Sequence, residues 1–254
     1  MSESLLSILL PVRNEAEHLK IMVPILEAIL EHPHEVLIIY DFPEDNSIPV
    51  SRLLQSRYNN IRLIHNDLGS GVTNAIKKGV EQSKGELILV MLADEIFPIL
   101  AISDMLELMN AGCQLVSGTR YGKGGRRFGG SLLGGILSRF ANYSFRMISG
   151  SVFTDATASV KMFRKEIFDD FRIDSKVGGT FGFEMAIKCQ TLNFRTGEVP
   201  LISVDRVFGG ESSFRLFSWL PEYLKWYFWG LKKISWWNRR SRPLRIEALK
   251  NRRI

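Results

Sequence analysis

The stretch from residue 7 to residue 92 holds four apolar runs of strand length: SILLPV at 7–12, EVLIIY at 35–40, IRLIH at 61–65 and ELILVML at 86–92. Such near-continuous apolar runs are typical of parallel strands that are buried on both faces. Between them, apolar residues recur at helical spacing over 15–30 and 71–82. This alternation predicts a doubly wound α/β sheet that binds ligands at the carboxyl ends of its strands.

Beyond residue 115 the pattern changes. A loop rich in glycine and arginine, GTRYGKGGRRFGG, precedes a helical stretch around 131–149, and apolar segments return as VKMF and GEVPLISV. Glycines lose much entropy on ordering and arginines offer donors to anions, so we expect this loop to act as an active-site lid. The chain length fits one catalytic domain, over residues 1–213, followed by a tail over residues 214–254.

The tail combines aromatic and basic residues. All five tryptophans lie in it, and residues 231–254 carry a net charge of +8, so the rest of this +6 chain carries −2. Trp219, Tyr223, Trp226 and Trp237 fall near one helical stripe, with Ser218 as the expected N-cap and Pro221 in the first turn. Lysines interrupt the apolar run well short of the ~20 residues of a spanning helix. We therefore expect an amphipathic helix on an anionic membrane surface; the alternative is packing on the catalytic body or on a partner subunit.

Other features of the sequence indicate where the protein acts and which partners it lacks. The start MSESLLSILLPV has no basic segment before its apolar run, and the two cysteines show no metal-ligand spacing. We expect a cytoplasmic protein, peripheral on the cytoplasmic face of a membrane. No nucleic-acid partner is expected, because the basic end lacks a recognised motif and its aromatics are clustered beside the charge.

Carboxylates follow three of the four strands, in PVRNEAEHL, YDFPEDNS and LADE. At such positions they bind a base, a ribose or a hard divalent cation, or they cap helices. Capping or turn formation is the interpretation we favour for Asp45 and Asn46, and a functional role for Asp94. The segment NDLGSGVTNAIKKG places glycines before a helix start, where an anion is stabilised.

In this order the motifs resemble family 2 glycosyltransferases, and within them the dolichol-phosphate mannose synthases and polyprenyl-phosphate glycosyltransferases. The resemblance covers roughly residues 7–213, from LLPVRNEAEHL and EVLIIYDFPEDNS to GTRY, LSRFAN, TDATASVKMFRKE and GEVPLISVDRVFGGES. It implies the GT-A fold, a Rossmann-like, mostly parallel sheet flanked by helices. It also implies a nucleotide-sugar donor and transfer with inversion at the anomeric carbon.

The resemblance also assigns site residues. Ala93 and Asp94 would hold the donor diphosphate and its metal, with Asp94, Arg120 and Arg206 as the catalytic set and both arginines on phosphates. The residues around the nucleotide would be Pro11, Arg13, Glu15, Ile39 and Asp41. A metal and guanidinium groups stabilise the charge that a departing nucleoside diphosphate gains.

The chain departs from the family pattern at the metal motif. Leu92 replaces the first acid of the D-x-D motif and Ile96 a later polar residue, which leaves Asp94 as the family ligand. Glu95 is a substitute ligand only if a turn brings both carboxylates to one ion. Mg²⁺ or Mn²⁺ remains the expected cofactor, because Mg²⁺ can be held by one or two carboxylates plus substrate phosphates.

Two further departures concern the nucleobase of the donor and the binding of the acceptor. Arg13 stands where relatives often have Tyr, so the identity of the donor's nucleobase is left open. Leu133, Gly134 and Gly135 replace a basic cluster on the acceptor side, and the substitutes would be Arg126, Arg127 and Arg139.

The acceptor decides whether a general base is needed. A polyprenyl, dolichyl-type lipid phosphate is already anionic and needs no general base. A sugar hydroxyl would need a carboxylate as general base, and Glu184 is the candidate. We favour a structural role for Glu184. The alternatives to the lipid-phosphate enzyme are a soluble transferase with a hydroxyl acceptor and a degenerate protein that binds nucleotide-sugar without turnover. A membrane subunit or a second copy would be further partners.

Overall fold

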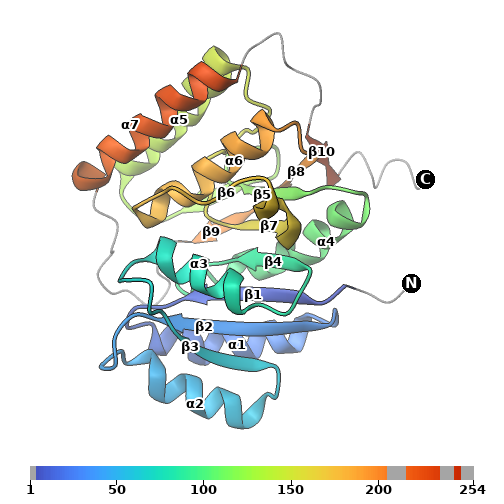
Figure 1. Ribbon diagram of the computed structural model, residues 1–254, viewed down its shortest axis with the longest axis vertical. Coiled ribbons are helices and arrows are strands. Elements are labelled where there is room, and N and C mark those ends of the chain that lie inside the picture. The colour runs from blue at the N-terminus through green and yellow to red at the C-terminus, as the bar shows by residue number, and fades with distance from the viewer. Residues whose placement is uncertain (1–3, 205–215, 235–242, 247–254) are drawn as a thin grey trace.

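The computed structural model describes residues 4–204, 216–234 and 243–246. Its main feature is an eight-stranded sheet in the order β10-β8-β5-β7-β4-β1-β2-β3 (Figure 1). These strands are β1 Leu6–Pro11, β2 His34–Tyr40, β3 Ile61–His65, β4 Leu87–Val90, β5 Leu115–Thr119, β7 Lys161–Arg164, β8 Thr196–Pro200 and β10 Leu244–Arg245. A separate parallel pair joins β6 Arg126–Phe128 to β9 Ile202–Val204.

Helices cover both faces of the sheet. The α-helices are α1 Ala16–Ile29, α2 Ser47–Arg57, α3 Val72–Gln82, α4 Ile102–Asn110, α5 Leu132–Ser149, α6 Phe181–Thr191 and α7 Leu216–Lys233. Three short 3-10 helices are η1 Phe97–Ala101, η2 Lys165–Asp169 and η3 Gly178–Thr180. Together they form the three-layer architecture in which the predicted carboxyl-end site lies at one edge of the sheet.

The core divides into two clusters because successive strand residues point to opposite faces. Ile8 and Leu10 of β1 pack with α1, α2 and α4, whereas Leu9 packs with α3, α6 and α7. Every residue of β1 and β4 is buried, as the continuous apolar runs predicted.

Strand β7 is the one reversed strand of this sheet among the described residues. It pairs antiparallel with both β4 and β5, while the other pairs are parallel. Its amino end therefore lies at the same sheet edge as the carboxyl ends of its neighbours. The loop before β7, residues 150–160, is in this way brought between the ends of β4 and β5.

Most predicted elements are confirmed to within about two residues, with differences at β5, at the start of α7 and in the predicted lid loop. The sequence pattern did not single out β5, a five-residue strand at the point where the clear alternation ends. Helix α7 begins at Leu216, so Ser218 is not its N-cap and Pro221 lies in the second turn, where it removes one intrahelical hydrogen bond. The predicted lid loop is partly ordered by the pairing of β6 with β9.

The aromatic stripe of α7 faces the protein body. Trp226 is buried, and Trp219 and Tyr223 lie close to Gly179 of η3. For these residues the alternative of packing on the catalytic body is therefore the correct one, and Trp237 lies outside the described residues. Within the described ranges, no helix combines the length and apolar composition needed to cross a membrane.

Candidate active site

Asp41 organises the glycine-rich loop that follows β3. Its carboxylate accepts hydrogen bonds from Asn66 Nδ2 at 2.7 Å, Ser70 Oγ at 3.1 Å and the Gly71 N–H at 2.8 Å. Gly71 is the N-cap of α3 and has a φ of +125°, which a side chain would strain. The carboxylate thus takes the place predicted for a bound anion at this helix start.

The loop after β1 is locked to the loop after β2. Asp45 Oδ1 accepts from the N–H groups of Asn14 and Ser47, and Asn46 Oδ1 accepts from Ala16. Asn14 has a positive φ of 57°, a conformation that asparagine tolerates better than most residues. The predicted turn role of Asp45 and Asn46 is therefore confirmed.

The other residues predicted around the nucleotide lie at the ends of β1, β2 and β4. Arg13 is exposed and its guanidinium lies 5.8 Å from the centre of the Phe42 ring, while Glu15 contacts His18 Nδ1 at 2.7 Å. Three further side chains are buried and apolar: Pro11, Ile39 and Ala93. Ile39 packs in the core beside α3, so any part it plays in nucleotide binding is to support Asp41. Nucleotide contact by these residues stays a prediction.

Asp94 and Glu95 lie in the turn that the metal hypothesis requires. The Glu95 N–H donates to the Leu92 carbonyl at 3.1 Å, so the chain reverses directly after β4. Glu95 Oε1 accepts from Ser203 Oγ of β9 at 3.3 Å. Burial lowers the pKa of Arg120, but the charge of Asp155 and, to a smaller extent, that of Glu95 raise this pKa overall. Glu95 is therefore oriented toward β9 and the arginine, which leaves Asp94 as the better candidate ligand.

The carboxylates that follow β4 fit a divalent ion only if water and substrate supply most of its ligands. In the part of the chain that the structure describes, no group of three or more His, Cys, Asp or Glu side chains converges on one point. Mg²⁺ and related ions accept such sites, in which one or two carboxylates act together with phosphate oxygens. The oxygen chemistry of Asp94 fits that kind of ion.

Arg120 is held in place by a buried carboxylate. Its Nε and Nη2 donate to Asp155 at 2.7 and 2.9 Å, and its backbone N–H donates to the same carboxylate at 3.1 Å. Burial raises the pKa of Asp155, but the Arg120 charge and hydrogen bonds outweigh it and the net pKa is lowered. The bidentate pair fixes the orientation of the guanidinium group.

Asp155 reaches Arg120 because β7 runs antiparallel. Arg120 follows β5, and Asp155 belongs to the loop that leads into the neighbouring β7. The motif TDATASVKMFRKE by itself indicates no role for its aspartate. The available signal was a carboxylate in an otherwise small and uncharged segment, TDATASV at 154–160.

Two more buried ionisable side chains, Lys161 and Glu198, lie close to the pair of Arg120 and Asp155. Burial lowers the pKa of Lys161 to about 8, against the opposing charges of Asp155 and Glu198, and Lys161 Nζ donates to Ser117 Oγ at 2.6 Å. Burial also raises the pKa of Glu198, which accepts from the Thr154 and Asp155 N–H groups. Arginine, aspartate, lysine and glutamate thus alternate in sign beneath the site.

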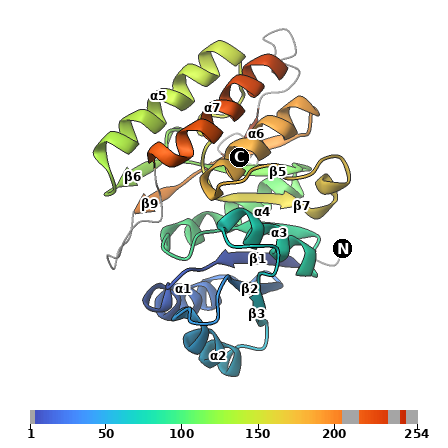
Figure 2. The ribbon, with the colours of Figure 1, turned by 60° about the vertical axis from the view of Figure 1, so that its left-hand side comes forward.

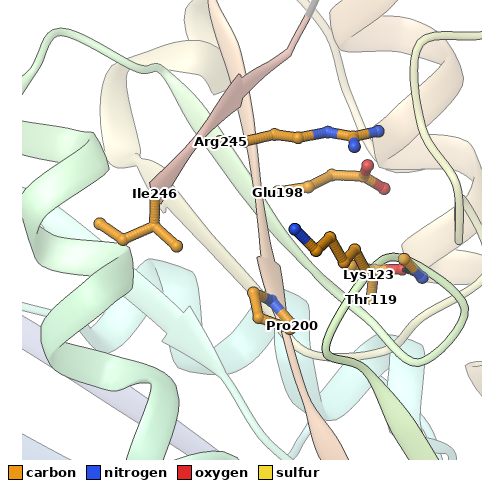
Figure 3. Close-up of a pocket in the computed structure, with 7 residues that line it drawn as sticks. Thr119, Lys123, Glu198, Pro200, Arg245 and Ile246 are labelled. Carbon is orange, nitrogen blue, oxygen red and sulfur yellow. Dashed lines mark hydrogen bonds between the residues drawn. The ribbon is translucent and has the colours of Figure 1, made fainter. Parts of the chain in front are cut away.

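A small cavity adjoins Glu198. Figure 3 shows the side chains of Lys123, Glu198 and Arg245 gathered around it. Its lining residues are Thr119, Gly122, Lys123, Glu198, Pro200, Arg245 and Ile246. None of the predicted nucleotide or metal residues lines this cavity, so we do not place the donor in it.

The ring of Tyr121 lies against two arginines. The Arg120 and Arg139 guanidinium carbons are 5.1 and 5.3 Å from the ring centre, within the range of cation–π attraction. Arg139, from α5, is thereby brought beside the Arg120 site, as the proposed substitute for the family's basic cluster requires. Arg206 lies outside the described residues, and its role stays a prediction.

Glu184 is enclosed by structural partners. Its carboxylate accepts from the N–H groups of Asp174 at 2.7 Å and Ser175 at 2.8 Å, from Ser175 Oγ, and from Lys188 Nζ at 2.6 Å. The side chain is 0% exposed. These contacts support the structural role favoured from the sequence.

Glu184→Gln is expected to destabilise the fold by about 1–3 kcal/mol, because its amide NH₂ would face backbone N–H donors and the ion pair with Lys188 would be lost. Turnover per folded molecule should fall less than about 10-fold, well short of the loss expected for a general base. Denaturant unfolding and initial rates measure the two quantities. Glu166→Gln, at an exposed site on η2, is the matched control. A loss of several orders of magnitude in turnover by a stably folded Glu184→Gln would instead identify Glu184 as the base.

Comparison with known proteins bears on the family and the fold. The sequence profile of glycosyl transferase family 2 matches residues 7–172. Polyprenol monophosphomannose synthase of Mycolicibacterium smegmatis is 23% identical over 207 residues, covering 80% of this chain and 78% of that protein. Dolichol-phosphate mannosyltransferase of Pyrococcus furiosus is 26% identical over 121 residues, covering 47% of this chain. That match spans 34% of the length of the Pyrococcus protein.

Solved structures show the same architecture. Glucosyl-3-phosphoglycerate synthase of Mycobacterium tuberculosis, in complex with Mn²⁺, UDP-glucose and phosphoglyceric acid, matches with a TM-score of 0.69 at 13% identity. The match covers 90% of this chain and 80% of that one. A mannosyltransferase from Pyrobaculum calidifontis, in complex with GDP-Man and Mn²⁺, matches with a TM-score of 0.61 at 14% identity, over 89% of this chain and 63% of that one. These similarities confirm the predicted GT-A fold.

Proposed function

The chain belongs to glycosyl transferase family 2, and from this premise we propose that it moves a sugar from a nucleotide-sugar to a polyprenyl phosphate at a membrane surface, with inversion. The observation that carries the proposal is the placement of Arg120. A fully buried Asp155 fixes its guanidinium group at the sheet edge where β4 delivers Asp94. A positioned guanidinium is suited to stabilise a leaving diphosphate or to orient an anionic acceptor.

On the donor side, the ends of β1, β2 and β3 would hold the nucleoside. The Asp41 loop and the Asn14–Asp45 turn supply a fixed backbone there. Asp94 would ligate Mg²⁺ or Mn²⁺ together with the donor diphosphate, and a bound ion would polarise the phosphate oxygens. The relatives from Mycobacterium tuberculosis and Pyrobaculum calidifontis both contain Mn²⁺, which supports this assignment.

On the acceptor side, an anionic phosphate oxygen would attack without losing a proton. The enclosure of Glu184 supports this choice, since its carboxylate is committed to Asp174, Ser175 and Lys188. Arg139 and Arg120, which share the Tyr121 ring, are the candidate partners of the acceptor phosphate. Two relatives named for dolichol and polyprenol phosphates support a lipid phosphate over a soluble saccharide.

The proposal is tested by a thermal-shift panel of GDP-, UDP- and CDP-sugars, each with and without Mn²⁺. One nucleotide class is expected to raise the Tm, because a ligand at 100 times its Kd stabilises by about 2.7 kcal/mol. The shift should be larger with Mn²⁺, since the ion joins Asp94 to the diphosphate. A second arm measures transfer from that donor to a short polyprenyl phosphate.

Three results would count against the proposal. No shift with any sugar nucleotide would remove the donor assignment. A donor shift followed by transfer to a soluble saccharide but not to the polyprenyl phosphate would favour the soluble transferase, and binding without any transfer would favour the non-catalytic alternative. Mn²⁺ alone is the control, because any stabilisation by the ion itself must be subtracted from the shift that needs the donor.

A further inference from the structure

Helix α5 exposes an unusually apolar outer face. On the opposite side of this helix, which faces the rest of the fold, Asn142, Phe145 and Ser149 are buried. Leu132 is 81% exposed and Phe140 66% exposed. The exposed apolar side chains of this helix are Leu132, Leu133, Ile136, Leu137, Phe140, Tyr143, Met147 and Ile148.

Helix α7 extends this face. It lies beside α5 in both views (Figures 1 and 2), with Tyr227 Oη donating to Ser144 Oγ at 3.0 Å. Leu220, Leu224 and Phe228 are exposed and spaced four residues apart, so they form one stripe. Together the two helices present eleven exposed apolar side chains, which we call the α5–α7 face.

The exposed charges on these two helices are all positive. Arg139 and Arg146 of α5 are seven residues apart and thus share one side of their helix, about 150° around from the Ser144 side that meets α7. The exposed lysines of α7 are Lys225, Lys232 and Lys233. Glu222, the one carboxylate on α5 or α7, is partly buried and pairs with Lys225 at 3.2 Å. The face is therefore apolar, with basic residues along its edges.

We propose that the α5–α7 face docks on an anionic lipid bilayer, with α5 as the larger contributor. Monomeric proteins rarely expose a contiguous apolar patch of this kind unless it binds something. Aliphatic and aromatic side chains flanked by Lys and Arg match the acyl boundary and the negative headgroups of such a bilayer. A second copy of this chain is a poorer match, because two-fold pairing would bring the same basic edges together.

The face is joined to the Arg120 site through α5. Asn142, on the buried side of α5, donates to Thr157 Oγ1 at 2.8 Å, and Thr157 in turn donates to Asp155 at 3.1 Å. A bilayer on the outer face of α5 would thus lie one helix away from the residues that hold Arg120. The inference does not depend on the proposed acceptor, since it rests on the exposed side chains alone.

Vesicle co-sedimentation of the full chain tests the inference. The vesicles contain phosphatidylcholine, with or without phosphatidylglycerol, and the parent should bind the anionic vesicles more tightly. Ile136→Glu with Phe140→Glu should weaken binding by about 100-fold or more, because two exposed apolar groups are replaced by charges. Arg146→Gln with Lys232→Gln should weaken binding to anionic vesicles by about 10-fold or more and leave binding to neutral ones nearly unchanged.

The matched control is Leu53→Glu with Leu100→Glu, which changes two equally exposed apolar residues away from the face, 69% and 60% exposed. This control should bind vesicles as the parent does, and all variants should keep the parent's Tm. The inference is overturned if the α5 variant binds like the parent, or if the parent binds neither kind of vesicle. It is also overturned if the parent is a dimer that the α5 variant converts to a monomer, which would assign the face to contact between copies. Thermal shifts induced by the nucleotide-sugar test the proposed function independently of vesicle binding. Failure of the proposed function can therefore be told apart from failure of this inference.

Discussion

Asp94→Asn is expected to lower the rate of sugar transfer by about 100- to 1000-fold, the loss typical of removing one group that stabilises developing charge. Asn has nearly the same size as Asp but no charge with which to hold a divalent ion. Asp94 is partly exposed in a turn at the end of β4, so the fold should be preserved. Initial rates at a series of Mn²⁺ concentrations measure the effect, which should include a higher Mn²⁺ requirement.

The control for Asp94→Asn is Asp169→Asn, which removes a carboxylate from an exposed position on η2. It should transfer sugar at the parent's rate. If Asp94→Asn and the parent have equal rates and equal Mn²⁺ dependence, Asp94 is not the metal ligand. The turn that carries Glu95 would then have to be assigned another role.

Asp155→Asn is expected to reduce the free energy of unfolding by about 3–5 kcal/mol, because it leaves the Arg120 guanidinium buried without its counter-charge. Asp155 is fully buried, and only 18% of the Arg120 side chain is exposed. Urea unfolding at neutral pH measures the loss. Transfer activity should fall as well, since Arg120 loses the contacts that orient it.

The loss should depend on pH with a defined sign. The folded-state pKa of Asp155 lies below its ordinary value of 3.8, so the unfolded chain binds more protons between the two pKa values. The stabilisation by Asp155 is therefore complete above that ordinary value and is lost as the pH falls through the folded-state pKa. The difference in stability between the parent and Asp155→Asn should accordingly shrink in strong acid and stay constant around neutrality.

A double variant separates stability from catalysis. Arg120→Met with Asp155→Leu removes both charges, and such apolar replacement of a buried pair is often neutral or stabilising. We expect it to recover most of the unfolding free energy that Asp155→Asn loses but none of the activity. Full activity in a stable double variant would contradict the role proposed for Arg120. Asp170→Asn, at an exposed position, is the control for the single change.

Local pattern was enough to predict the parallel half of the sheet. Strands such as β1 and β4 are buried on both faces, so nearly all of their residues are apolar and the run is visible in the sequence. The same physics explains why the position of Asp94 could be predicted, because a carboxylate shortly after a buried strand must lie at the edge where the chain emerges. Strand β5 was missed because it is short and contains Ser117, Gly118 and Thr119.

Contacts between distant residues were beyond local pattern. Asp155 is 35 residues from Arg120 in the chain, and only the reversal of β7 brings the two together. The commitment of Asp41 to Gly71 and of Glu184 to Lys188 likewise depends on which loops pack side by side. Helical periodicity also cannot tell which apolar stripe faces the body.

The sequence by itself determined that this is a family 2 transferase of the GT-A type, because the order of its motifs and the burial of its strands are local properties. The tertiary structure alone decided how the site is supported and which surface is left apolar. In α7 the tryptophan stripe packs inward, and the outer face is formed by Leu224, Phe228 and the residues of α5. The physical reason is that burial is shared between elements: a side chain is covered or exposed according to its neighbours in space, which its position in the chain does not reveal.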